Sequence, residues 1–175
     1  MIRSAAFASL ILLSGCVTHE KKIVDAEISR HLAASSPKSS GTCQSGFVTV
    51  SDGRTDIGMG AVIGLDATLA DAKSVLSTEL RRAGVNVRES QSDAIKLTLK
   101  HVNLSQQYES RSISVVVIVE VPGYPQKIIR SSETSVIWAG KTVETEKAIA
   151  KVFRRTVGQI VDYLNATCAR PAEKK

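Results

Sequence analysis

Few side chains in this sequence have the types and spacing that catalysis requires. Ser35 and Lys38 have the Ser-x-x-Lys spacing of an acyl-transfer site, but Pro37 prevents the helix on which such a site is built. No Gly-x-Ser-x-Gly motif occurs either. Three acids lie in segments of turn composition, where solvated carboxylates are usual: Asp52, Asp56 and Asp66. We therefore predict that the chain is not an enzyme.

The sequence pattern also offers no ligand set for a metal or a nucleotide. The three histidines and three cysteines show no Cys-x-x-Cys or His-x-x-x-His spacing. The glycine-rich segment 58–64 lacks Gly-x-Gly-x-x-Gly spacing and a following Lys-Ser or Lys-Thr, so it predicts a mobile connection rather than a phosphate-binding loop. We expect no metal and no other cofactor.

Cys16 is the residue with the clearest chemistry. A short basic start at Arg3 and an apolar run over residues 5–13 precede the sequence Leu13-Ser14-Gly15-Cys16. This run is far shorter than the roughly 20 residues that cross a hydrocarbon core, which favours a cleaved signal peptide over a transmembrane helix. We predict that residues 1–15 are a signal peptide.

The sequence around Cys16 resembles the bacterial lipobox, because small residues precede the cysteine and a leucine lies three positions before it. The resemblance implies that Cys16 Sγ receives diacylglycerol, that the chain is cleaved before Cys16 and that the new amine is acylated. Two or more acyl chains hold a protein firmly to a membrane. An ordinary signal peptide would leave the leucine–cysteine spacing to chance, and a buried N-terminal helix would leave Arg3 unexplained. Val17 follows instead of Asp, and by resemblance to enterobacterial lipoproteins this favours the periplasmic face of the outer membrane.

The composition indicates one exported domain with an aliphatic core. The chain has 175 residues, of which 43% are hydrophobic and only 4% aromatic. Loss of residues 1–15 removes a single charge, that of Arg3, and lowers the formal charge from +6 to +5. Export and the scarcity of aromatic residues argue against nucleic acid as a partner. The pairs Arg81-Arg82 and Arg154-Arg155 indicate solvated helix faces, while contact with anionic lipid or lipopolysaccharide stays open.

Two cysteines remain once Cys16 is assigned to lipid. Cys43 and Cys168 lie near opposite ends of the expected domain, in an oxidising compartment where cysteines tend to pair. We predict a disulfide between them, which would stabilise the fold by about 4 to 5 kcal/mol in the chain-entropy model. Two separate thiols are the alternative, because the sequence does not give the distance between them.

The chain divides into a tether, one domain and a tail. Residues 16–45 are polar and include a Ser/Pro/Gly-rich stretch typical of a flexible spacer, with a short helix over 23–32 as an open alternative within it. Residues 46–168 carry the hydrophobic patterns of a single domain. Residues 169–175 are polar, and we expect them to be disordered.

The first half of the domain predicts a strand, a helix and further strands. Residues 47–50 are β-branched and precede a turn, and residues 69–83 have apolar positions at helical spacing, with Thr68 as the expected cap and Gly84 as the expected stop. Apolar residues then alternate over 95–104, with a change of parity that predicts a β-bulge near His101. We expect His101 to be a structural or surface residue.

The second half predicts a hairpin and a long helix. Residues 112–121 alternate cleanly, Pro122-Gly123 indicates a turn, and residues 126–138 return as a strand. The centre of the returning strand is polar on both faces, so it belongs at a sheet edge or on a wet face. From Thr142 a sustained apolar stripe predicts the second helix.

This order predicts an α+β fold in which a mainly antiparallel sheet of about four strands carries two helices on one face, in the order β-α-β-β-β-α. The segments 48–56, 80–87 and 157–164 resemble the YajG-like bacterial lipoproteins, over a span of residues 47–165. That family implies no catalytic residues. More distantly, the anchor and the element order resemble the layout of LptE, a lipoprotein inside the lipopolysaccharide translocon, although layout does not give function.

Two functions of different class follow from these patterns. The first is a non-catalytic lipoprotein that acts in envelope assembly or as a protein-interaction module, with the half-polar strand over 126–138 as the interacting element. The second is binding of lipid or lipopolysaccharide, which the +5 charge and the aliphatic faces favour. The expected partners are the membrane, through the anchor, and an envelope protein. The oligomeric state stays open.

Overall fold

The structure is a computed structural model that describes residue 28 and residues 46–62, 65–89, 94–136 and 142–168. Cys16, Cys43, the predicted signal peptide 1–15 and the predicted tail 169–175 lie outside the described residues, so the expectations for them stay predictions. Ile28 is helical and only 1% exposed, and it belongs to the hydrophobic core.

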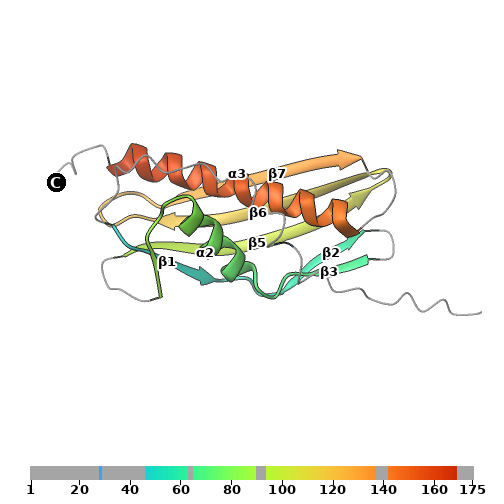
Figure 1. Ribbon diagram of the computed structural model, residues 1–175, viewed down its shortest axis with the longest axis horizontal. Helices are drawn as coiled ribbons and strands as arrows, with labels where there is room; N and C mark the ends of the chain where they lie inside the picture. Colours follow the sequence, from blue (N-terminus) through green and yellow to red (C-terminus); the bar gives the residue numbers. More distant parts are fainter. Residues whose placement is uncertain (1–27, 29–45, 63–64, 90–93, 137–141, 169–175) are drawn as a thin grey trace, which may run out of the picture.

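From residue 46 on, the described residues form seven strands and two helices (Figure 1). In chain order they are β1 (Val48–Asp52), β2 (Gly58–Val62), β3 (Leu65–Thr68), α2 (Ala72–Arg82), β4 (Val87–Arg88), β5 (Ile95–Gln107), β6 (Ser110–Glu120), β7 (Lys127–Val136) and α3 (Thr142–Cys168). Five strands form the main sheet in the order β4-β1-β5-β6-β7, and β2 and β3 form a separate hairpin. The predicted α+β class and its β-α-β-β-β-α order are confirmed, with five strands rather than about four.

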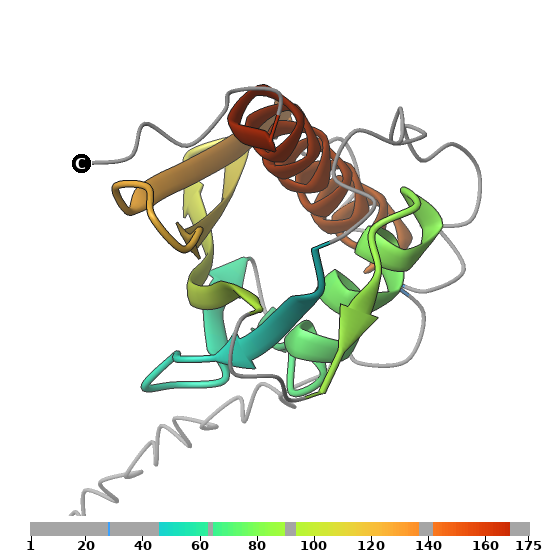
Figure 2. The same ribbon diagram turned by 90° about the vertical axis from the view of Figure 1, so that its left-hand side faces the viewer.

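The core lies between one face of the sheet and the two helices. Every second residue of β6, from Ile113 to Val119, is fully buried, as the alternation predicted. Phe153 of α3 and Leu80 of α2 pack into the same cluster. Figure 2 shows the sheet curved around this core, with α3 along the β6–β7 side and α2 along the β1–β4 side. The opposite face of the sheet carries no helix among the described elements. No helix in the described ranges is long and apolar enough to cross a membrane.

The structure confirms the bulge that the change of parity predicted. The register between β5 and β6 shifts between Leu99 and His101, so the apolar residues on both sides of the shift face the core. His101 itself is exposed. At the end of α2, Gly84 has φ +84° and the amide of Val85 donates to the carbonyl of Leu80, which confirms Gly84 as the helix stop.

Two local predictions are wrong, and both errors come from the same hairpin. Residues 58–62 form strand β2 rather than a mobile connection, because Gly60, with φ +116°, lets the backbone pass close to the carbonyl of Leu104. Thr68 pairs with Gly58 at the end of β3 and does not cap α2. Asp71 occupies the N-cap position instead, without a side-chain cap.

Candidate functional site: the β7 edge, the open sheet face and the α2–β4 hollow

Strand β7 is the edge of the main sheet. It pairs with β6 on one side, and no described strand lies on its other side. The polar centre that predicted an edge position, residues 130–135, lies in the middle of this strand. An edge strand presents unpaired N–H and C=O groups, which makes it a template for pairing with another chain.

The register shows which backbone groups of β7 are free. Gln107 and Ser110 flank a two-residue turn and therefore form a hydrogen-bonded pair. Backbone hydrogen bonds alternate along an antiparallel pair. The even-numbered residues of β6 therefore form backbone hydrogen bonds with β5, and the odd-numbered residues form them with β7. The odd-numbered residues of β7 then bond to β6. The even-numbered residues of β7, from Ile128 to Val136, point their N–H and C=O groups away from the sheet.

One outward carbonyl is already occupied. Arg155 of α3 donates from Nη1 to the carbonyl oxygen of Ser132, which agrees with the outward direction derived from the register. Arg155 Nη2 also lies 3.1 Å from Glu133 Oε2, and Lys151 donates to the other carboxylate oxygen of Glu133. The Lys151 hydrogen bond is the main reason why the pKa of Glu133 is lowered. Two cations of α3 therefore cover the middle of the edge.

Polar residues on the inner face of the hairpin are satisfied by α3. Ser131 Oγ donates to Gln159 Oε1 over 2.9 Å. Arg111, which is 5% exposed, donates to Ser135 Oγ, to Thr145 Oγ1 and to the carbonyl of Glu144. Burial lowers the pKa of the Arg111 guanidinium. These bonds fix the start of α3 against β6 and β7, which gives Arg111 a structural role.

The open face of the sheet combines aliphatic and basic side chains. Ile118 faces Ile128 across β6 and β7, and Val116 lies opposite Arg130 and His101. Ile128 is 50% exposed. We call this set, Val116, Ile118 and Ile128, the aliphatic patch.

Asp52 and Asp56, two of the acids noted in the sequence, bind different partners, and the side chain of Asp66 lies outside the described residues. Asp52 binds Arg54 with Oδ2 2.7 Å from Nη2, a hydrogen bond that lowers the pKa of the Asp52 carboxyl. Asp56 accepts from the amide of Gly58, and Arg82 pairs with Glu79. Across the described ranges, no group of three or more His, Cys, Asp or Glu residues could hold a metal ion. Cys168 is the last residue of α3.

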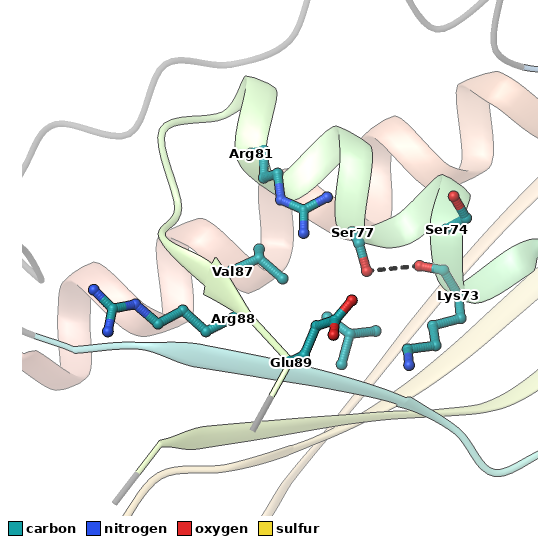
Figure 3. A pocket seen from close by; sticks show the side chains of 8 residues that line it. Lys73, Ser74, Ser77, Arg81, Val87, Arg88 and Glu89 are labelled. Atoms are coloured by element: carbon teal, nitrogen blue, oxygen red, sulfur yellow. Dashed lines mark hydrogen bonds between the residues drawn. The ribbon is translucent and has the colours of Figure 1, made fainter. Parts of the chain in front are cut away.

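A hollow of about 270 Å³ lies between α2 and β4, and the sequence did not point to it. Lys73, Ser77 and Arg81 lie four residues apart along α2 and line the same hollow. Glu89, directly after β4, lines the opposite side of the hollow. Figure 3 shows its carboxylate between the side chains of Lys73 and Arg81. The helical spacing of Lys73 and Arg81 was visible in the sequence. The partner side of the hollow was not, because β4 has only two residues.

Comparisons with known proteins find distant likeness only. No family model matches the sequence, and no curated protein matches it. An uncharacterized protein of solved structure is 16% identical with a TM-score of 0.47, covering 68% of this chain and 92% of that chain. A minor lipoprotein from Acinetobacter baumannii is 14% identical with a TM-score of 0.44, covering 74% of this chain and 96% of that chain.

Another such structure is the rare lipoprotein B from Shewanella oneidensis. It is 13% identical with a TM-score of 0.37, and the alignment covers 70% of this chain and 93% of that chain. The structures similar to this chain thus include small bacterial lipoproteins. At these identities and TM-scores, the similar structures do not indicate the function of this chain. Membership of the YajG-like family stays a prediction.

Proposed function

We propose that this chain is a non-catalytic lipoprotein, anchored through Cys16 to the periplasmic face of the outer membrane, that docks a strand of a partner envelope protein against β7. The observation that carries the proposal is the row of outward N–H and C=O groups along the ten residues of β7. An added strand would satisfy these groups and extend the sheet.

The side chains beside the free edge suit a neighbouring strand. The even-numbered residues of β7 are all exposed on the open face, and they include Ile128 and Val136, each 50% exposed. A docked strand would cover part of both side chains. Burial of apolar area is worth about 25 cal/mol per Å², so these two residues add affinity to the backbone hydrogen bonds.

Arg155 makes docking conditional. Its guanidinium already holds the Ser132 carbonyl, so an incoming strand has to displace that hydrogen bond or stop before it. Charged side chains at an edge are a common protection against unwanted pairing. Arg155 would therefore disfavour nonspecific strand pairing at β7. Only a partner with enough other contacts would displace its hydrogen bond and dock.

Blocking one outward amide should abolish docking. In Thr134→Pro the proline removes an N–H that points away from β6, which an edge strand tolerates, whereas Thr134→Val keeps that N–H. With a photoreactive residue at position 130 of the lipidated chain in intact cells, we expect one adduct with an envelope protein. The adduct should disappear in Thr134→Pro and remain in Thr134→Val. In Arg155→Ala, which frees the Ser132 carbonyl, it should increase severalfold.

Several outcomes contradict the docking proposal. An adduct of equal yield in Thr134→Pro, confirmed as folded by its thermal unfolding, would show that the β7 edge is not used. An adduct that contains only a second copy of this chain would replace the partner by self-association. The same photoreactive residue at Lys147, which is exposed on α3, serves as the control position and should give no such adduct.

The anchor in this proposal rests on the sequence around Cys16. Twelve positions separate Cys16 from the buried Ile28, so the chain between them spans at most about 40 Å. The domain would thus stay close to the membrane surface. The proposed disulfide between Cys43 and Cys168 would tie the same N-terminal segment to the end of α3.

Replacing Cys16 should detach the protein from the membrane. In cells fed radiolabelled palmitate, we expect label in the wild-type protein and none in Cys16→Ala, because the thiol that accepts the lipid is gone. Cys43→Ala should keep the label and the membrane fraction. Label retained in Cys16→Ala would disprove lipidation at this residue.

Binding of lipid or lipopolysaccharide is the second candidate function. The aliphatic patch favours it, because Arg130 and His101 lie directly beside Val116 on the open face. If position 130 gives no protein adduct in any variant, while vesicles of anionic lipid retain the unlipidated chain and release it at high salt, this function replaces docking.

A further inference from the structure

We infer that the hollow between α2 and β4 is a binding site for a phosphate group. This site is separate from the β7 edge, since β4 and β7 are the two opposite edges of the main sheet. The inference therefore goes beyond the proposed docking function and does not depend on it.

The hollow is formed by the main sheet and α2. Its floor includes Val50 of β1 and Val87 of β4, both from the sheet, and α2 forms its opposite wall. With about 270 Å³ it has room for a phosphate together with part of the group that carries it.

The charges that face the hollow are predominantly positive. Lys73 and Arg81 reach it from α2, and among the described residues Glu89 is the only acid that lines it. Neither Lys73 nor Arg81 takes part in any of the salt bridges between described residues, whereas Arg82 of the same helix pairs with Glu79. Lys73 and Arg81 are thus two cations without a salt bridge to a described residue, although the charge of Lys73 adds to the hydrogen bond of Arg54 in lowering the pKa of Asp52.

Two of the other polar groups that line the hollow are already engaged. Arg88 lines the hollow, but its guanidinium carbon lies 3.5 Å from the centroid of the Phe47 ring, and Figure 3 shows its side chain directed away from Arg81. Ser77 Oγ donates to the carbonyl of Lys73. The donors available to a ligand are therefore the guanidinium of Arg81, the ammonium of Lys73 and the hydroxyl of Ser74. A guanidinium binds phosphate oxygens in pairs, and an ammonium adds a point charge.

Glu89 has a distinct role in this site. Its carboxylate lies between Lys73 and Arg81 in Figure 3, the place that an anionic ligand would take. It balances the two cations when the hollow is empty and repels an incoming phosphate. Glu89 therefore weakens phosphate binding, and its removal should tighten it.

The test titrates the full chain with inorganic phosphate at constant ionic strength, by calorimetry or by amide chemical shifts. We expect saturable binding that weakens about tenfold in Lys73→Gln and in Arg81→Gln, and that strengthens about tenfold in Glu89→Gln. Lys147→Gln on α3 makes the same charge change at an exposed residue that does not line the hollow, and it should leave the affinity unchanged. A second arm measures retention by vesicles of phosphatidic acid in phosphatidylcholine, compared with phosphatidylcholine alone.

The two arms distinguish the sources of the phosphate. Saturable binding of inorganic phosphate indicates a soluble ligand, and vesicle binding alone, with the same dependence on Arg81 and Glu89, indicates a lipid headgroup. The inference is overturned if neither arm shows binding, or if Lys147→Gln lowers the affinity as much as Arg81→Gln. An affinity that does not rise in Glu89→Gln would also overturn it, because the carboxylate of Glu89 lies between Lys73 and Arg81, where the phosphate would bind.

Discussion

Replacing Arg111 by methionine should lower the free energy of unfolding by about 3 kcal/mol. The guanidinium donates three hydrogen bonds inside the protein, 2.8 Å to Thr145 Oγ1 and 2.9 Å each to Ser135 Oγ and the carbonyl of Glu144. Methionine fills a similar volume but donates nothing, so it leaves these acceptors without their partner in a site that is nearly closed to water. Urea unfolding followed by circular dichroism measures the loss.

A matched control lies on the adjacent strand. Arg130 of β7 is exposed on the open face, so Arg130→Met should change the free energy of unfolding by no more than about 0.5 kcal/mol. Arg111→Lys keeps the charge but cannot make three directed bonds, and it should recover only part of the stability. If Arg111→Met unfolds at the same urea concentration as wild type, these hydrogen bonds do not stabilise the fold and the account of Arg111 is wrong.

The elements that the sequence predicted correctly are those with a strong period of their own. Every second residue of β6 from Ile113 to Val119 is apolar, and α3 carries a continuous apolar stripe. The period of each segment is therefore enough to predict its secondary structure. The bulge before His101 was also predictable, because a change of parity in a strand with one buried face leaves no other solution. The polar centre of β7, residues 130–135, also indicated an edge position, because a strand that is polar on both faces does not fit the buried middle of a sheet.

The missed elements depend on contacts between distant segments. β2 contains two glycines in five residues and has no alternation of its own, so its strand conformation comes from packing beside β5 and pairing with β3. The parallel pairing of β1 with both β4 and β5 likewise has no local signal. The α2–β4 hollow was not predictable for the same reason, because Glu89 and Arg81 line one hollow only when β4 joins the sheet.

Gly60 is the residue where this long-range packing can be tested most directly. A Cβ at position 60 would lie 2.1 Å from the carbonyl oxygen of Leu104, and the residue has φ +116°, a conformation that side chains other than glycine rarely adopt. Gly60→Ala thus combines a backbone clash with backbone strain. We expect it to lower the free energy of unfolding by at least about 3 kcal/mol, with urea unfolding as the measurement.

Gly123 separates the two effects. It has φ +81°, but a Cβ there would meet no atom within 4 Å, so Gly123→Ala introduces strain alone and should cost about 1 kcal/mol. The difference between the two variants then measures the close approach of β2 to β5. Equal losses would mean that β2 moves away from β5 without cost. The hairpin would in that case rest on its own pairing with β3, and the packing that explains why residues 58–62 form a strand would not hold.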